Sequence, residues 1–145
     1  MKARRMLLFL LLLVLLLAGC DLSHKHYLDE WGVCRSCGED LTVRLTPRAE
    51  GGYTATAAPT YGSDTVYFRF SARGEEGVSL SLSPEGEARV REVSLYPKGG
   101  SRVSLFPTSS NATGFLYEGT LGEGVDYYVA VTLTGGGSVS LTVAP

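Results

Sequence analysis

Residues 125–133, Val-Asp-Tyr-Tyr-Val-Ala-Val-Thr-Leu, decide the fold, because large apolar side chains recur there at every second position. Successive side chains of a β-strand point to opposite faces, so a period of two predicts a strand with one face in a hydrophobic core. Shorter stretches with the same alternation occur at residues 41–46, 53–57, 66–72, 78–82, 93–96, 103–105, 115–121 and 139–143. We therefore expect about eight or nine strands.

Short segments rich in glycine, proline and polar residues separate the predicted strands, which follow one another roughly every ten residues. This spacing is typical of a β-sandwich or a barrel. Serine, threonine and arginine fill the intervening positions, as on the wet face of an antiparallel sheet. We predict an all-β, antiparallel β-sandwich over residues 41–145. The triple glycine at residues 135–137 predicts a hairpin between the last two strands.

The N-terminus has the features of a secretory signal. Lys2, Arg4 and Arg5 are followed by an almost continuous apolar run over residues 6–17 and then by Ala18, Gly19 and Cys20. A positive start, a short apolar run and small residues define such a signal. The apolar run is shorter than the roughly 20 residues that a membrane-spanning helix needs.

The sequence Leu-Ala-Gly-Cys at residues 17–20 resembles the lipobox of bacterial lipoproteins. The resemblance implies a diacylglycerol group on the Cys20 thiol, removal of residues 1–19 as a signal peptide, and acylation of the new amine by palmitate or a similar chain. Two or more acyl chains hold a protein stably on a membrane. We expect a lipid-anchored protein facing the periplasm or cell exterior, with a tether over residues 20–40.

The charge of the predicted mature chain argues against nucleic-acid binding. Removing residues 1–19 leaves 126 residues with 10 basic and 15 acidic side chains, a net charge of −5. Nucleic-acid-binding domains usually carry a basic patch. The length suits one domain with its own core.

Three segments of the predicted sandwich carry a family resemblance: residues 64–70 (DTVYFRF), 124–131 (GVDYYVAV) and 137–143 (GSVSLTV). They are similar to strands of the bacterial pre-peptidase C-terminal domain, although Val139 stands where tyrosine is usual, and the resemblance extends from about residue 45 to residue 143. The resemblance implies a jelly-roll-like sandwich and a non-catalytic accessory role. Because one fold serves many functions, the resemblance alone does not fix a function.

Cys34 and Cys37 are separated by two residues within the predicted tether. With Cys20 committed to lipid, they form the only possible internal pair, and disulfides persist outside the cytoplasm. We predict a local disulfide between them. A zinc site that also uses His24 and His26, and a thiol-exchange role, remain alternatives.

The sequence predicts no catalytic residues, no bound metal and no cofactor. No histidine follows His26, so a serine–histidine–aspartate triad within the sandwich would lack its base. Tyr67 and Tyr128 are predicted to face outward from long strands, where aromatic rings can stack on sugars or anchor a protein. We expect a non-catalytic envelope lipoprotein that binds or supports a protein or polysaccharide partner. A subunit of a larger surface or secretion assembly, and a redox or zinc-handling lipoprotein, are the alternatives.

Overall fold

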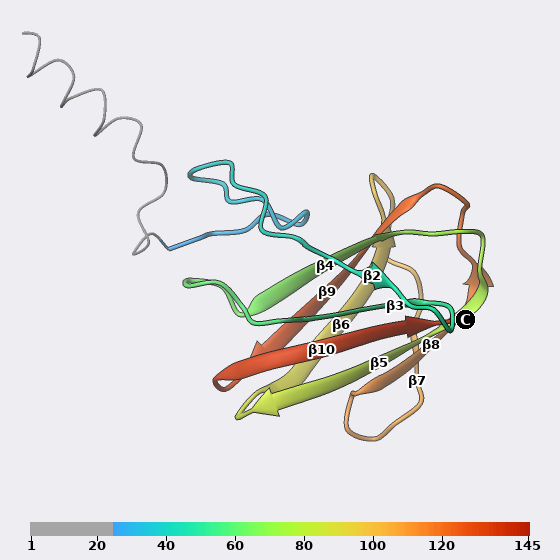
Figure 1. The fold of residues 1–145 in the computed structure, drawn as a ribbon. Coiled ribbons are helices and arrows are strands. Elements are labelled where there is room, and N and C mark those ends of the chain that lie inside the picture. Colours follow the sequence, from blue (N-terminus) through green and yellow to red (C-terminus); the bar gives the residue numbers. More distant parts are fainter. Residues whose placement is uncertain (1–24) are drawn as a thin grey trace, which may run out of the picture.

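A computed structural model describes residues 25–145, which fold into ten β-strands and no helix (Figure 1). The predicted signal, the lipobox, Cys20 and His24 lie outside the described residues. In chain order the strands are β1 (Val43–Arg44), β2 (Thr46–Pro47), β3 (Tyr53–Ala57), β4 (Thr65–Ser71), β5 (Glu76–Gly86), β6 (Arg89–Pro97), β7 (Phe106–Pro107), β8 (Gly114–Thr120), β9 (Asp126–Thr134) and β10 (Gly137–Ala144). Within residues 25–145, no helix could cross a membrane.

Two sheets form the sandwich. One has four strands in the order β1-β4-β9-β6, and the other has six in the order β2-β3-β10-β5-β8-β7. All pairings are antiparallel except that of the short strand β1 with β4. From β3 to β6 each strand lies in the opposite sheet to the one before it, and β9 and β10 do the same, as in a jelly roll. The predicted all-β sandwich is confirmed.

The core lies between the sheets and is built from the alternating apolar residues. Phe68 of β4 and Val129 and Val131 of β9 are fully buried, as are Leu80 of β5 and Leu141 of β10. Their neighbours in sequence point outward, so each strand contributes every second side chain to the core.

The predicted hairpin at residues 135–137 is wrong. Strand β9 belongs to the four-stranded sheet and β10 to the six-stranded sheet, so the glycines carry the chain across the sandwich. Gly135 has a φ of +80°, and a Cβ there would lie 2.1 Å from the carbonyl oxygen of Glu87. The second crossing, between β5 and β6, runs alongside: the Glu87 amide donates a hydrogen bond of 2.8 Å to the Gly136 carbonyl. The two corners lie in close contact, and at Gly135 that contact leaves no room for a Cβ.

Two predicted strands differ from those observed. The stretch 41–46 is divided between the sheets, with β1 beside β4, β2 beside β3 and buried Leu45 between them. In the stretch 103–105 the Val103 amide donates to Leu95, but the strand itself, β7, begins at Phe106. An alternating pattern marks residues that face the core, and it does not reveal where a chain changes sheets.

Residues 25–42 pack against the outer face of the four-stranded sheet, so the packed chain begins well before the predicted domain boundary at residue 41. Backbone bridges join Leu28 to Cys34 and Val33 to Asp40. Asp40 accepts hydrogen bonds from the amide and hydroxyl of Thr42, which hold the pKa of its carboxyl below the usual value, helped by the guanidinium of Arg69 at 3.8 Å. We call residues 25–40 the N-terminal loop.

Candidate binding site

Trp31 is held in place by the backbone of the N-terminal loop. The side chain of Asp29 accepts hydrogen bonds from the amides of Trp31 (2.9 Å) and Val33 (3.0 Å). Gly32 has a φ of +73° and sits so close to β4 that a Cβ would lie 2.9 Å from Cβ of Tyr67. This short aspartate-capped turn directs the indole ring toward the sheet rather than into solvent.

The indole ring covers two tyrosines of the sheet. Its centroid lies 5.7 Å from that of Tyr96 on β6 and 5.2 Å from that of Tyr128 on β9, at interplanar angles of 66° and 71°. The two tyrosines face each other in register across β6 and β9, with nearly parallel rings 5.9 Å apart. The Tyr96 hydroxyl donates a hydrogen bond to the backbone carbonyl of Glu30. The three rings therefore join the N-terminal loop to the sheet.

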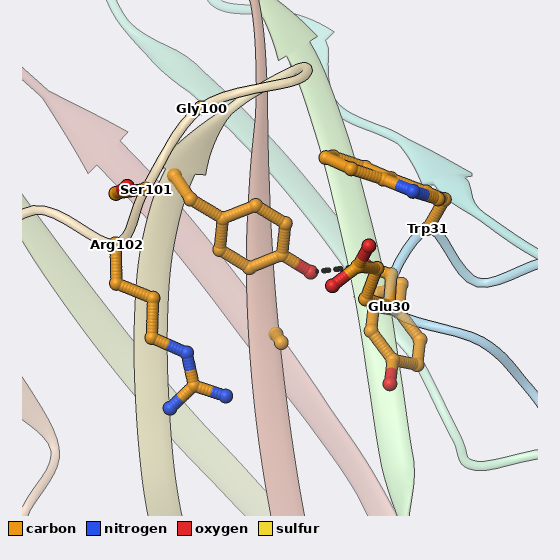
Figure 2. Close-up of a pocket in the computed structure, with 8 residues that line it drawn as sticks. Glu30, Trp31, Gly100, Ser101 and Arg102 are labelled. Carbon is orange, nitrogen blue, oxygen red and sulfur yellow. Dashed lines mark hydrogen bonds between the residues drawn. The ribbon is translucent and has the colours of Figure 1, made fainter.

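A pocket of about 360 Å³ opens beside this cluster, and we call it the Trp31 pocket. Figure 2 shows Glu30 and Trp31 on one side of it and Gly100, Ser101 and Arg102 on the other. The remaining lining residues come from the outer face of the sheet: Tyr67, Tyr96 and Ala130.

Ala130 makes the concavity possible. It lies on β9 in register between Tyr67 on β4 and Ser94 on β6. Two residues before Ala130 on β9, Tyr128 pairs with Tyr96 of β6, and the rings of both tyrosines project from the same face of the sheet. A small side chain among large ones leaves a hollow between the N-terminal loop and the segment that follows β6.

Both phenols that line the Trp31 pocket stay neutral at ordinary pH. Burial raises the pKa of Tyr96 well above its usual value, and the neighbouring Tyr67 and Glu30 add to the effect. Burial also raises the pKa of Tyr67, helped by Asp29. Across the pocket, the Arg102 guanidinium lies 3.0 Å from the Glu92 carboxylate, and both side chains are largely exposed. The lining thus offers hydroxyl, carboxylate, guanidinium and aromatic groups.

The structure separates the two tyrosines that the sequence singles out. Tyr67 lines the Trp31 pocket, whereas Tyr128 lies beneath the indole ring and is only 4% exposed. Sequence reasoning missed Trp31, Glu30 and Arg102 as members of one site. The signal that could have found it is the single tryptophan of the chain, placed in a segment otherwise interpreted as a tether.

The cysteine segment forms a second cluster near the start of the N-terminal loop. A ring nitrogen of His26 and the Sγ atoms of Cys34 and Cys37 all lie within 4.8 Å of one another. The His26 Nδ1 atom is 3.9 Å from the Cys37 Sγ. Cys34 is buried and Cys37 exposed. Imidazole and thiolate are ligands that zinc accepts, so the cluster holds three of the four groups of the zinc alternative, and the fourth, His24, lies outside the described residues. Cys37 is disulfide-bonded in this structure, and its pairing with Cys34 stays a prediction.

Comparisons with known proteins give no family. No family model matches the chain. A stretch of 78 residues is 32% identical to an acetyl-CoA:oxalate CoA-transferase from Acetobacter aceti, and it covers 53% of this chain. The match spans only 20% of that relative's length. The similarity therefore covers only a small part of the transferase and does not assign the transferase's activity to this protein.

Proposed function

We propose that this protein is a non-catalytic bacterial envelope lipoprotein, anchored through lipid on Cys20, whose β-sandwich binds a partner at the Trp31 pocket. The observation that carries the binding role is the pocket itself, with three aromatic residues, a carboxylate and a guanidinium around one concavity. Ligand sites are usually concave, with aromatic walls and a few polar groups that fix orientation. The anchor rests on the lipobox resemblance at residues 17–20.

The elements around the pocket support binding rather than catalysis. Tyrosine hydroxyls are protonated near neutral pH, and burial raises the pKa of Tyr67 and Tyr96 further, so neither is prepared to act as a base there. Glu30 and Arg102 are both exposed at the rim, where charged groups orient a ligand. This arrangement places charged groups of two loop segments beside tyrosines of the sheet, so that they can orient a ligand.

A pull-down from envelope extracts tests the proposal. The full-length lipoprotein in mild detergent is compared with Tyr67→Ala, which removes a wall of the pocket, and with Phe106→Ala. Phe106 is an aromatic residue 52% exposed on the six-stranded sheet, and it does not line the pocket. The proposal expects a protein or glycan retained by the wild type and by Phe106→Ala but lost from Tyr67→Ala. Equal retention by all three forms, or none by any, contradicts it.

A second candidate function, thiol or zinc handling, is favoured by the His26–Cys34–Cys37 cluster. The sulfur atoms of Cys34 and Cys37 and a ring nitrogen of His26 lie within 4.8 Å of one another, so reduction of the Cys37 disulfide would release a thiol beside an imidazole. Thiol titration and zinc analysis of the purified mature protein separate the possibilities. One zinc per chain, displaced together with thiol exposure by a chelator, supports zinc handling. A disulfide that survives mild reductant, with no zinc, leaves a structural role only.

A further inference from the structure

We propose that the ligand of the Trp31 pocket is a neutral carbohydrate, with one sugar ring lying against the aromatic wall and its hydroxyl groups bonded by Glu30 and Arg102. This inference rests on the proposed binding function and names its ligand class.

The aromatic wall suits one face of a sugar ring. Trp31 is half-buried, so part of the indole remains open to solvent beside Tyr67. The indole N–H and the Tyr67 hydroxyl are polar tips on apolar bodies. A pyranose has the complementary character, since its C–H groups form an apolar face and its hydroxyls project from the rim. An aromatic surface that is held rigid can cover that face at little cost in conformational entropy.

The charges of the lining favour a neutral, polyhydroxylated ligand. Glu30 and Arg102 stand on opposite sides of the Trp31 pocket (Figure 2). A phosphate or other anion would be repelled by the Glu30 carboxylate, and a simple cation would be repelled by the Arg102 guanidinium. A wholly apolar side chain would desolvate both charges without bonding to either. Sugar hydroxyls donate to a carboxylate and accept from a guanidinium, so they satisfy both sides at once.

The size of the pocket limits how much glycan it can hold. Its volume, about 360 Å³, lies near the lower end of the range of small-molecule sites, roughly 300–1,000 Å³. Ala130 forms its floor, and the N-terminal loop and residues 100–102 bound it on two sides. We therefore expect it to hold a mono- or disaccharide-sized portion of a chain rather than a long extended polymer.

The single tryptophan provides the measurement, because all tryptophan fluorescence of this chain comes from the wall of the pocket. The full-length lipoprotein in detergent is titrated with three neutral tetrasaccharides, of β-1,4-linked N-acetylglucosamine, β-1,4-linked glucose and α-1,4-linked glucose. Phosphocholine is the zwitterionic comparison. We expect saturable fluorescence change with at least one tetrasaccharide. Calorimetry should show binding at least about tenfold weaker for Arg102→Ala and Glu30→Gln, since each loses a charge-assisted hydrogen bond.

The controls separate this inference from the proposed function. Phe106→Ala should bind sugar like the wild type, and circular dichroism should show all variants folded. If no tetrasaccharide binds, or only phosphocholine does, while Tyr67→Ala still loses a partner from envelope extracts, the carbohydrate inference is overturned and the binding function stands. If neither sugars nor extracts show dependence on the pocket, both are overturned.

Discussion

The indole ring of Trp31 lies across the ring of Tyr128 with their centroids 5.2 Å apart, although one residue precedes the first strand and the other lies on β9. The contact leaves Tyr128 only 4% exposed on what is otherwise the outer face of its sheet. The N-terminal loop therefore forms part of the packed domain, and it brings Glu30 to the rim of the Trp31 pocket.

Replacing Trp31 with alanine should lower the free energy of unfolding by about 2 kcal/mol, since two aromatic contacts are lost and two buried tyrosines become exposed. Urea denaturation followed by circular dichroism measures the change. Tyr27→Ala is the matched control, because Tyr27 lies in the same loop and is 59% exposed. It should change stability by no more than about 0.5 kcal/mol. Equal midpoints for both variants would show that the indole contacts add nothing.

The glycine corner gives a second prediction. Gly135→Ala places a Cβ 2.1 Å from a backbone oxygen at a φ of +80°, so it should lower the free energy of unfolding by about 2 kcal/mol or more. Gly136→Ala is the control, because a Cβ there has no neighbour within 4 Å. It should leave stability nearly unchanged. Thermal unfolding of the two variants tests whether the close crossing constrains the fold, and identical melting temperatures would contradict it.

Tyr53 should make stability sensitive to alkaline pH. Burial, together with a hydrogen bond to Glu75, raises its pKa to about 12. The unfolded chain loses the phenol proton near pH 10 while the folded chain keeps it, so stability falls as the pH rises from about 10 to about 12. Tyr53→Phe should reduce the slope of stability against pH over that range, and Tyr67 and Tyr96, whose pKa values are also raised by burial, should account for the rest. At pH 7 it should cost about 1–2 kcal/mol, because the single hydroxyl proton is shared between the Ser71 carbonyl and the Glu75 carboxylate and both lose it.

The lipid anchor gives a prediction that does not depend on the sandwich. Cys20→Ala should move the protein from the membrane fraction to the soluble fraction or block its processing, since no thiol remains to carry the diacylglycerol group. Mass spectrometry of the wild-type N-terminus should show a lipidated Cys20 and no residues 1–19. Cys37→Ala is the control and should stay in the membrane fraction. Membrane association of both variants would count against the lipobox interpretation.

The sequence predicted the sandwich well because the core has a simple repeating rule. Residues such as Phe68, Val129 and Leu141 alternate with polar neighbours, and each is buried as the period of two requires. The crossing at residues 135–137 could not be predicted in the same way. A tight turn and a corner between sheets use the same residues, and the strands that flank them have the same pattern.

The candidate site was predictable only in part. Tyr67 follows from strand alternation, because an aromatic residue between inward-facing positions must lie on the outer face. Trp31 and Arg102 come from irregular segments, whose paths are set by local hydrogen bonds such as that of Asp29. No periodicity describes those segments, so nothing in the sequence indicated that they meet across Ala130.

If Cys20 carries the proposed lipid, the early start of the packed chain limits how far the domain can move. The His26 amide is already bonded to the carbonyl of Tyr61, only six residues after Cys20. Six fully extended residues reach about 20 Å, whereas a domain of this size has a radius of gyration of about 14 Å. The sandwich could change its orientation at the membrane surface, but it would stay close to the lipid headgroups. With the proposed anchor, a ligand of the Trp31 pocket would have to reach the bilayer surface to be bound.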